Sequence, residues 1–455
     1  MTQTTPVDEL RGLLPAGRVV TDPAETEPYR HDWTRMPAGR PLAVVLAENA
    51  ADVQAALGWA ARHRVPVVPR GTGTGLAGGA TAVEGCLVVS TERMTAIEVD
   101  PATRTVVAGA GALTSAVKDA AALHGLWYPP DPGSFRISTI GGNVATNAGG
   151  ICCVKYGVTT DYVMGLDVVL ADGRLVTLGG RTVKDVAGLS LLKLFVGSEG
   201  TLGVVTRVVL RLVPLPAPSA TLVAWFDSTR AAAEAVVAMS LRVRPSMLEL
   251  MDTGAVNAVE DFRPMGLDRD AGCLLVGQSD APGTAREAEV AVMVACCEEA
   301  GALRAYALDD PVEGDLFLEA RRAAGPAIDA LGDVLAEDVC VPVDRLPVAM
   351  ARIEAVAAAT GTPIPVFAHA GDGNLHAAIV RTPGDEDSAR RAQEAFEAVL
   401  QVALDCGGTI SGEHGVGRTK VGVLPRQLGP DVMDVGRRVR DALDPLGILN
   451  PGVLW

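Results

Sequence analysis

Several features are scarce in this chain of 455 residues. The eight cysteines form no CxxC pair, which argues against an iron–sulfur motif and against a disulfide framework. The formal charge of −16 argues against nucleic acid as a partner, because phosphates would be repelled. No stretch approaches 18 uninterrupted apolar residues, and the first ten residues lack both a basic region and an apolar run. We therefore expect a soluble, cytoplasmic protein without a transmembrane segment.

Histidine is also rare, yet two of the six histidines lie within Phe367–His376. Asp372-Gly373, flanked by apolar residues, predicts a two-residue hairpin, because a type I′ turn needs positive φ at both central positions. In that register His369 faces His376, and directly opposed residues share a face with Cβ atoms about 4.5–5.5 Å apart. Such a pair can bind one metal ion. The alternative is a sheet that merely carries two histidines.

A second glycine-lined motif, Ser411–Gly417, contains an acid, Glu413, and a third histidine, His414. A carboxylate beside two imidazoles could complete a metal site. The two motifs together predict a metal-assisted active site.

Glycine is concentrated in segments that suit a large ligand. Pro69–Ala80 has five glycines in twelve residues and follows an expected strand, so its N–H groups could approach a pyrophosphate. The segment matches neither a P-loop nor a full Rossmann fingerprint. Pro129–Ser134 and Ser138–Gly150 are similarly rich in small residues, although a tight solvent loop is the alternative there. Glu199, in Gly197–Thr206, is either a satisfied buried carboxylate or a cofactor contact.

The chain is long enough for more than one domain. We expect a helical lead-in over residues 1–36, a first domain over 37–214, a proline-rich linker at 214–218 and a second domain over 219–455. In the first domain, Asp172-Gly173 predicts a hairpin. The strand and helix rhythm after the linker predicts an antiparallel sheet with helices on one face.

With these motifs in view, the chain resembles the FAD-dependent 2-hydroxy acid dehydrogenases of the vanillyl-alcohol-oxidase superfamily, such as the FAD-binding subunit of glycolate oxidase, D-lactate dehydrogenase and D-2-hydroxyglutarate dehydrogenase. The resemblance runs from about residue 20 to the C-terminus. It implies an α+β fold with an N-terminal PCMH-type FAD-binding domain and a C-terminal α+β cap built on a ferredoxin-like sheet. The motifs that carry it are Pro69–Ala80, Asp131–Gly150, Gly197–Thr206, Phe367–His376, Gly407–Lys420 and Leu449–Gly452.

The resemblance implies three groups of residues around FAD. The residues expected to line the pyrophosphate are Arg70, Gly71, Gly73, Thr74, Gly75, Gly78 and Gly79. Those expected between the pyrophosphate and the isoalloxazine edge are Pro132, Gly133, Ser138, Gly141, Gly142 and Asn147. Those expected by the adenosine half are Glu199, Gly200 and Val205, while Asn450 would return to the flavin from the C-terminal part. Because no histidine lies in the two main flavin loops, we expect the FAD to be non-covalent.

The resemblance also assigns the substrate site. His369, His376 and Glu413 correspond to the ligands of a divalent metal, for which we expect Zn, with Mn and Fe as alternatives. His414 corresponds to the catalytic base, and Arg321 to the arginine that holds the substrate carboxylate. Arg322 is the alternative to Arg321 if the register shifts by one residue.

Two departures from the family bear on substrate size. The residue two positions beyond the second histidine is typically asparagine in hydroxyglutarate dehydrogenases, and here it is Ala378. A lysine expected before Asp338 is absent, with Ala336 and Glu337 in that place. A five-carbon diacid needs a second polar anchor, so these losses favour lactate or glycolate.

The implied activity is oxidation of a small D-2-hydroxy acid by hydride transfer to flavin N5. The electron acceptor could be a quinone, a cytochrome, an electron-transfer flavoprotein or an iron–sulfur subunit. A homodimer, and attachment to a membrane through the acceptor, are further expectations. Two alternatives remain open: a non-redox FAD enzyme of the alkylglycerone-phosphate synthase type, and an FAD subunit that acts only within a multi-subunit glycolate oxidase.

Overall fold

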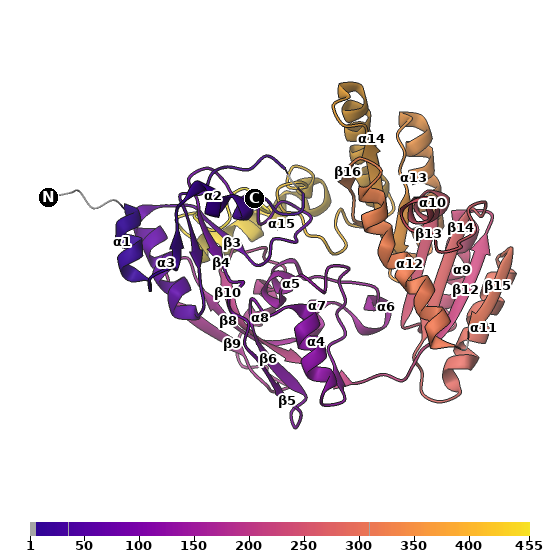
Figure 1. Cartoon of the computed structure of the whole chain (residues 1–455), viewed down its shortest axis with the longest axis horizontal. Helices are drawn as coiled ribbons and strands as arrows, with labels where there is room; N and C mark the ends of the chain where they lie inside the picture. Colours follow the sequence, from indigo (N-terminus) through magenta and orange to yellow (C-terminus); the bar gives the residue numbers. More distant parts are fainter. Residues whose placement is uncertain (1–5, 35, 309) are drawn as a thin grey trace. The chain divides into compact units, whose positions relative to one another are not determined.

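Figure 1 shows the computed structural model of the chain, which describes residues 6–34, 36–308 and 310–455. The chain divides into two compact units. The first comprises the chain up to Ala148, Val158–Leu215 and Glu413–Trp455, and the second comprises Gly149–Gly157 and Pro216–Gly412. The helix expected near the N-terminus is α1 (Pro6–Leu13). Residues 1–5 and 35 of the predicted lead-in lie outside the described residues.

The first unit contains a four-stranded sheet in which the last three strands run parallel. In sheet order these strands are β1 (Val19–Val20), β2 (Ala43–Leu46), β4 (Leu87–Ser90) and β3 (Val67–Arg70). α3 (Ala50–His63) connects β2 to β3; the Asn49 side chain caps its start, and Arg64 ends it in the left-handed conformation. Val53 and Leu57 of α3 are fully buried in the core beside this sheet. This packing fixes the point where β3 ends and the glycine-rich loop begins.

A second sheet of five antiparallel strands completes most of the first unit. In order these are β5 (Ile97–Asp100), β6 (Thr105–Gly109), β10 (Val204–Arg211), β8 (Val163–Val169) and β9 (Leu175–Gly179). The hairpin predicted at Asp172-Gly173 is confirmed, because β8 pairs with β9 across it. The shorter elements are α2 (Pro23–Thr26), α4 (Thr114–Ala122), β7 (Leu126–Trp127), α5 (Ile140–Thr146), α7 (Thr159–Tyr162), α8 (Leu191–Phe195) and β11 (Val213–Pro214).

The C-terminal segment of the chain returns to the first unit. α15 (Leu424–Leu443) has a break at Gly429, whose φ is 75° and which precedes Pro430. After α15 the chain lies along β3: the Val67 N–H donates to Ile448 O at 2.7 Å, and the Asn450 N–H donates to Val67 O at 2.8 Å. Residues far apart in the sequence therefore meet at the start of β3.

The second unit is built on an eight-stranded sheet whose strand pairs are all antiparallel. In order the strands are β15 (Arg304–Leu308), β12 (Ala220–Phe226), β14 (Cys273–Ser279), β13 (Met247–Asp252), β18 (Val366–His369), β19 (Asn374–Arg381) and β16 (Asp333–Ala336), with β17 (Val339–Cys340) also on β19. Its helices are α6 (Cys153–Tyr156), α9 (Thr229–Ser240), α10 (Thr253–Phe262), α11 (Ala285–Glu299), α12 (Pro311–Asp329), α13 (Leu346–Thr360) and α14 (Glu386–Asp405). No helix in the described ranges is both long enough and apolar enough to cross a membrane.

The expectation that helices cover only one face of this sheet is wrong. Val223 and Trp225 of β12 belong to a core that α10 and α12 complete. Leu222, which points to the opposite face, lies beside Gly277 together with Met293 of α11. All seven residues of β12 are buried, which requires cover on both faces.

The short segment Gly149–Gly157 belongs to the second unit although its sequence neighbours belong to the first. Ile151 is buried in the core that contains α10 and α12. The Lys155 ammonium and the Tyr156 hydroxyl both bond to the Asp280 carboxylate at the end of β14. These contacts hold the segment on the large sheet.

Candidate active site

The histidine hairpin joins β18 to β19 through four residues. The predicted register is wrong: His369 pairs with Asn374, and Phe367 pairs with His376. The neighbouring chain sets the turn. The Gly371 N–H donates to Leu248 O at 3.1 Å, and a Cβ on Gly371 would lie 2.7 Å from the Val154 side chain. These contacts fix a four-residue turn in place of the type I′ turn.

The predicted proximity of the two histidines holds nevertheless. The register differs from the predicted one by two residues, and an even shift keeps every side chain on its original face. The rings of His369 and His376 are 5.0 Å apart between centroids and nearly perpendicular. Both residues are buried, and a ring nitrogen of one lies within 4.8 Å of a ring nitrogen of the other. The hairpin therefore presents two imidazoles together.

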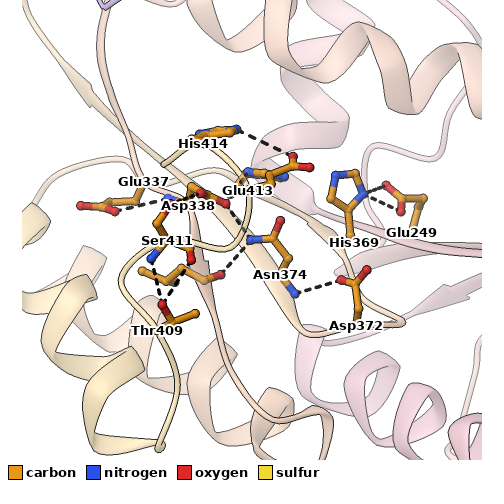
Figure 2. Close-up of polar contacts among 12 residues, drawn as sticks. Glu249, Glu337, Asp338, His369, Asp372, Asn374, Thr409, Ser411, Glu413 and His414 are labelled. Carbon is orange, nitrogen blue, oxygen red and sulfur yellow. Dashed lines mark hydrogen bonds and ion pairs between the residues drawn. The ribbon is translucent and has the colours of Figure 1, made fainter. Parts of the chain in front are cut away.

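A buried carboxylate holds His369 in place. Glu249 of β13 is the cross-strand neighbour of His369 and is only 1% exposed. Its two carboxylate oxygens lie 2.8 and 3.0 Å from His369 Nδ1, as Figure 2 shows. One of them also lies 2.7 Å from Nε of Arg321, which α12 supplies. The guanidinium of Arg321 stacks over the Phe367 ring at 4.5 Å.

A second buried carboxylate lies on the other side of the hairpin (Figure 2). Asp338 accepts a 2.8 Å hydrogen bond from Asn374 Nδ2 and a 2.9 Å bond from the Ser411 hydroxyl. Its carboxylate is 3.9 Å from His376 Nδ1, close enough for an ion pair when the imidazole is protonated. The Gly412 N–H donates to Asp338 O at 3.0 Å. These contacts fix the first two residues of the second predicted motif, Ser411–Gly417.

Glu413 and His414 follow Gly412 directly and open the segment that returns to the first unit. A Cβ on Gly412 would lie 2.3 Å from Asn374 Nδ2, so Gly412 rests against the start of β19. One peptide bond then connects this fixed point to Glu413. The Glu413 carboxylate and His414 Nε2 are 3.8 Å apart, and their side chains are 11% and 18% exposed.

In the first unit, the glycine-rich loop after β3 folds around the Arg70 side chain. The guanidinium donates to His31 O at 2.8 Å and to Pro28 O at 3.2 Å. Burial lowers the pKa of Arg70 from its ordinary value. A Cβ on Gly73 would lie 2.0 Å from this guanidinium. Arg70 therefore braces the loop from inside.

The second predicted loop meets the first at the start of α5. The Thr139 hydroxyl caps this helix by accepting from Gly142 N. A Cβ on Gly71 would lie 2.2 Å from the same hydroxyl, and the Thr72 hydroxyl donates to Ile137 O at 2.7 Å. Gly71 therefore packs directly against the start of α5.

The C-terminal segment closes over the same loop through two side chains. Asn450 Nδ2 donates to Gly79 O and to Glu199 O, both at 2.8 Å. Arg418 donates to Gly78 O at 2.7 Å and to Asn450 Oδ1 at 3.0 Å. Asn450 and Arg418 therefore hold the C-terminal segment against the backbone of the glycine-rich loop.

Glu199 is a satisfied buried carboxylate in this structure. It accepts from Val416 N at 2.9 Å and from Gly417 N at 2.8 Å, in the segment that follows His414. Burial raises its pKa to about 7, and these two hydrogen bonds act in the opposite direction. A Cβ on Gly200, whose φ is 73°, would lie 2.9 Å from the Pro69 ring.

The other predicted flavin residues lie in the loops of the first unit or in β10. Ser138 is buried just before α5, where its N–H donates to Ser134 O. Gly141 approaches Ala110 so closely that a Cβ would lie 2.7 Å away. Asn147 ends α5 in the left-handed conformation. The remaining residues are Thr74, Gly75, Pro132 and Gly133 in the loops and Val205 in β10.

Sequence reasoning missed several residues that shape these sites. They are Glu249, Asp338 and Asn374 around the histidines, and Thr139 and Arg418 around the glycine-rich loop. A glutamate in the middle of the apolar strand Met247–Asp252 was the available signal for Glu249. No local sequence pattern distinguishes the other missed residues.

Two family models match the chain: the FAD binding domain over residues 41–179 and the C-terminal domain of FAD linked oxidases over residues 215–454. The chain belongs to the FAD-linked oxidase family. Its first unit accordingly carries an FAD-binding domain of the PCMH type, and the match identifies FAD as the cofactor of this family member.

Curated relatives match along nearly the whole chain. The glycolate oxidase subunit GlcD of Bacillus subtilis is 38% identical over 97% of this chain and 93% of the relative. The D-lactate dehydrogenase of Archaeoglobus fulgidus is 37% identical over 94% and 95%. The D-2-hydroxyglutarate dehydrogenase of Xanthomonas citri pv. viticola is 32% identical over 98% and 96%.

Solved structures share the fold at low identity. A p-cresol methylhydroxylase structure has a TM-score of 0.81 at 16% identity, covering 99% of this chain and 96% of the other. The 4-ethylphenol oxidase of Gulosibacter chungangensis has a TM-score of 0.77 at 16% identity, with the same coverage. An alkyldihydroxyacetonephosphate synthase structure has a TM-score of 0.73 at 19% identity, covering 98% and 84%. These likenesses establish the fold alone.

Proposed function

We propose that this protein is an FAD-dependent, metal-assisted dehydrogenase that oxidises a small D-2-hydroxy acid to the 2-oxo acid. The observation that carries the proposal is the buried pair His369 and His376, of which Glu249 orients His369, in a chain that also carries an FAD-binding domain. The named activities of the relatives, glycolate oxidase and D-lactate dehydrogenase, support a 2-hydroxy acid as the substrate.

FAD would be held non-covalently by the loops of the first unit. The glycine-rich loop would offer backbone N–H groups to the pyrophosphate, and Asn450 and Arg418 keep that loop closed. FAD, when bound, accepts a hydride at N5. The chain's task is to present the substrate Cα and to remove a proton.

The donor set on the hairpin fits a divalent metal. Because Glu249 lies against Nδ1 of His369, Nε2 is the ring atom that would bind the metal. His369, His376 and Glu413 would hold the ion, and this mixed nitrogen and oxygen set suits Zn²⁺, with Mn²⁺ or Fe²⁺ as alternatives. A metal there lowers the pKa of a coordinated hydroxyl group.

His414 would then accept the hydroxyl proton, a role that suits an imidazole near neutral pH. Arg321 would hold the substrate carboxylate, which fixes the face of Cα that meets the flavin. The surroundings favour Arg321 over Arg322: the Arg321 side chain is 7% exposed and lies against Glu249, whereas Arg322 is 34% exposed and pairs with Glu319.

The two substitutions that favour a small substrate are neighbours in the sheet. Ala336 of β16 pairs directly with Ala378 of β19. Both positions therefore belong to one patch, and neither side chain can bind a distal carboxylate. This pairing supports lactate or glycolate over 2-hydroxyglutarate.

The electron acceptor is proposed to be a quinone, a cytochrome, an electron-transfer flavoprotein or an iron–sulfur subunit. One of the curated relatives is named as a subunit, which favours action within a larger glycolate oxidase as the second candidate. In that case the half-reaction at the flavin is the same, and only the route of the electrons differs.

Anaerobic bleaching of the flavin tests the proposal. The purified protein is titrated with D-lactate, L-lactate, glycolate and D-2-hydroxyglutarate while the flavin absorbance is recorded. We expect D-lactate or glycolate to bleach the flavin and D-2-hydroxyglutarate to do so only weakly. A protein that contains FAD and metal but is bleached by none of the four acids would overturn the proposed function.

A further inference from the structure

Glu249 is a carboxylate that contacts the candidate active site and is only 1% exposed. It lies in the middle of β13, where Val276 and His369 are its neighbours on the two adjoining strands. Burying a carboxylate in an apolar sheet is costly unless its partners compensate. Here the partners are His369 and Arg321, which are themselves buried. The carboxylate thus joins two residues to which the proposed function gives different tasks.

The contact with His369 selects the tautomer of that ring. An ionised carboxylate has no proton to donate, so a short contact with Nδ1 requires the proton to lie on Nδ1. Both carboxylate oxygens lie within 3.0 Å of this atom. The lone pair is then on Nε2, and the ring is held against rotation. A histidine fixed in this way is a stronger metal ligand.

The contact with Arg321 occupies only one part of the guanidinium. Nε forms an ion pair with Glu249 at 2.7 Å, and neither Nε nor the buried Nη2 makes a hydrogen bond among the residues that the structure describes. The stacking on Phe367 fixes the plane of the group. Nη2 therefore remains for a carboxylate ligand, a group that guanidinium nitrogens bind through strong, charge-assisted hydrogen bonds.

We propose that Glu249 is a positioning residue that orients His369 for metal binding and Arg321 for carboxylate recognition at the same time. The inference rests on the proposed function and adds to it. One buried carboxylate would make metal binding by His369 and carboxylate binding by Arg321 depend on each other. A purely structural role would instead make Glu249 a contributor to stability only.

The test compares Glu249→Gln with Glu260→Gln. Glu260 is a suitable control because it is a buried carboxylate of the same unit, 7% exposed, whose Oε1 accepts from Met265 N and Leu267 N. A glutamine can keep those two bonds. At position 249 the amide can accept from His369 through its oxygen, but its NH₂ group then opposes Arg321.

Three quantities are measured on the FAD-containing proteins: Zn²⁺ affinity by competition with a chelator, pyruvate affinity of the metal-free protein from the flavin spectrum, and the thermal midpoint. We expect Glu249→Gln to weaken Zn²⁺ binding about 10–100-fold. Pyruvate binding should weaken as well, with FAD retained, and Glu260→Gln should bind both as the wild type does. Partial recovery of Zn²⁺ affinity in Glu249→Asp would support the positioning role even if the glutamine variant folds poorly.

Equal Zn²⁺ and pyruvate affinities in Glu249→Gln and Glu260→Gln, with only the midpoint lowered, would overturn the inference. A wild-type protein that binds no metal and is bleached by no hydroxy acid would overturn the proposed function instead. The two failures are therefore distinguishable.

Discussion

At the scale of single residues, the proposed site separates side chains that would hold a metal from one that would move a proton. His369 is buried against Glu249, whereas His414 is 18% exposed and lies 3.8 Å from Glu413. A ligand should be fixed, and a base should be able to exchange its proton with solvent. The two histidines differ in this way.

This difference predicts two kinds of variant. Glu413→Gln and His369→Ala should lose bound metal and turnover while keeping FAD, because each removes a proposed ligand. His414→Ala should keep metal and FAD and lose about 10²–10⁴-fold in turnover, the usual contribution of a general base. Elemental analysis, flavin absorbance and steady-state rates measure the three properties.

The exposed His124 provides the control, since His124→Ala should change none of the three properties. Full turnover in Glu413→Gln or His369→Ala would rule out the metal assignment. An unchanged rate in His414→Ala would remove His414 as the base.

Residue types alone were enough to predict the two histidines of the site, but not the residues that hold them in place. His369 and His376 are rare residue types in a short motif, so the sequence exposes them. Glu249 lies 120 residues before His369 and is one of many acidic residues in the chain. Its role depends on β13 pairing with β18, a long-range contact that no local pattern encodes.

At the scale of elements, the β18–β19 hairpin and the strand β12 show which sequence rules predicted the structure correctly and which did not. The type I′ prediction failed at Asp372-Gly373 because contacts of Gly371 with Leu248 and Val154 decided the turn. The shared face survived because the shift was even. For β12, in which every residue except Thr221 is apolar, the sequence should have indicated a strand covered on both faces.

Gly412 gives a prediction at this scale. A Cβ there would lie 2.3 Å from Asn374 Nδ2, and Asn374 cannot move easily because it donates to Asp338 and Val339 O. Gly412→Ala should therefore lower the stability by about 1–3 kcal/mol and weaken metal binding, because the chain leading to Glu413 must shift. Thermal unfolding and metal content are the measurements.

Gly422→Ala is the matched control, because a Cβ on Gly422 would meet nothing within 4 Å. It should stay within about 0.5 kcal/mol of the wild type. Equal behaviour of the two alanine variants would contradict the close packing of Gly412 on Asn374.

At the scale of the whole molecule, each unit is assembled from separate stretches of chain. The first unit uses three and the second uses two. The proline-rich segment near residue 215 is visible in the sequence as a break. The sequence does not show that Gly149–Gly157 belongs to the second unit. That placement depends on Ile151 packing in a core formed by residues beyond 220, and on Asp280 accepting a hydrogen bond from Lys155.

Glu199, which links two of these stretches through its hydrogen bonds to Val416 and Gly417, predicts that the folding stability depends on pH. Burial raises its pKa from 4.5 to about 7. A raised carboxyl pKa means that the folded state binds the proton more tightly than the unfolded state. The stabilisation is therefore fully present below pH 4.5 and is lost as the pH rises through 7, a change of roughly 3 kcal/mol.

Glu199→Gln should remove this component, so the difference in thermal midpoint between wild type and variant should change between pH 5 and pH 8. In the wild type, the midpoint should fall relative to that of the variant as the pH rises. A difference that stays constant across this range would show that Glu199 does not titrate there.

The interleaved order of the chain also has a consequence for synthesis. Residues 413–455, which carry Arg418 and Asn450, leave the ribosome after the large sheet of the second unit has been made in full. The glycine-rich loop, although made early, lacks its hydrogen bonds with Arg418 and Asn450 until then. The nascent chain should therefore complete its second unit before its first, and acquire FAD only at the last stage of folding.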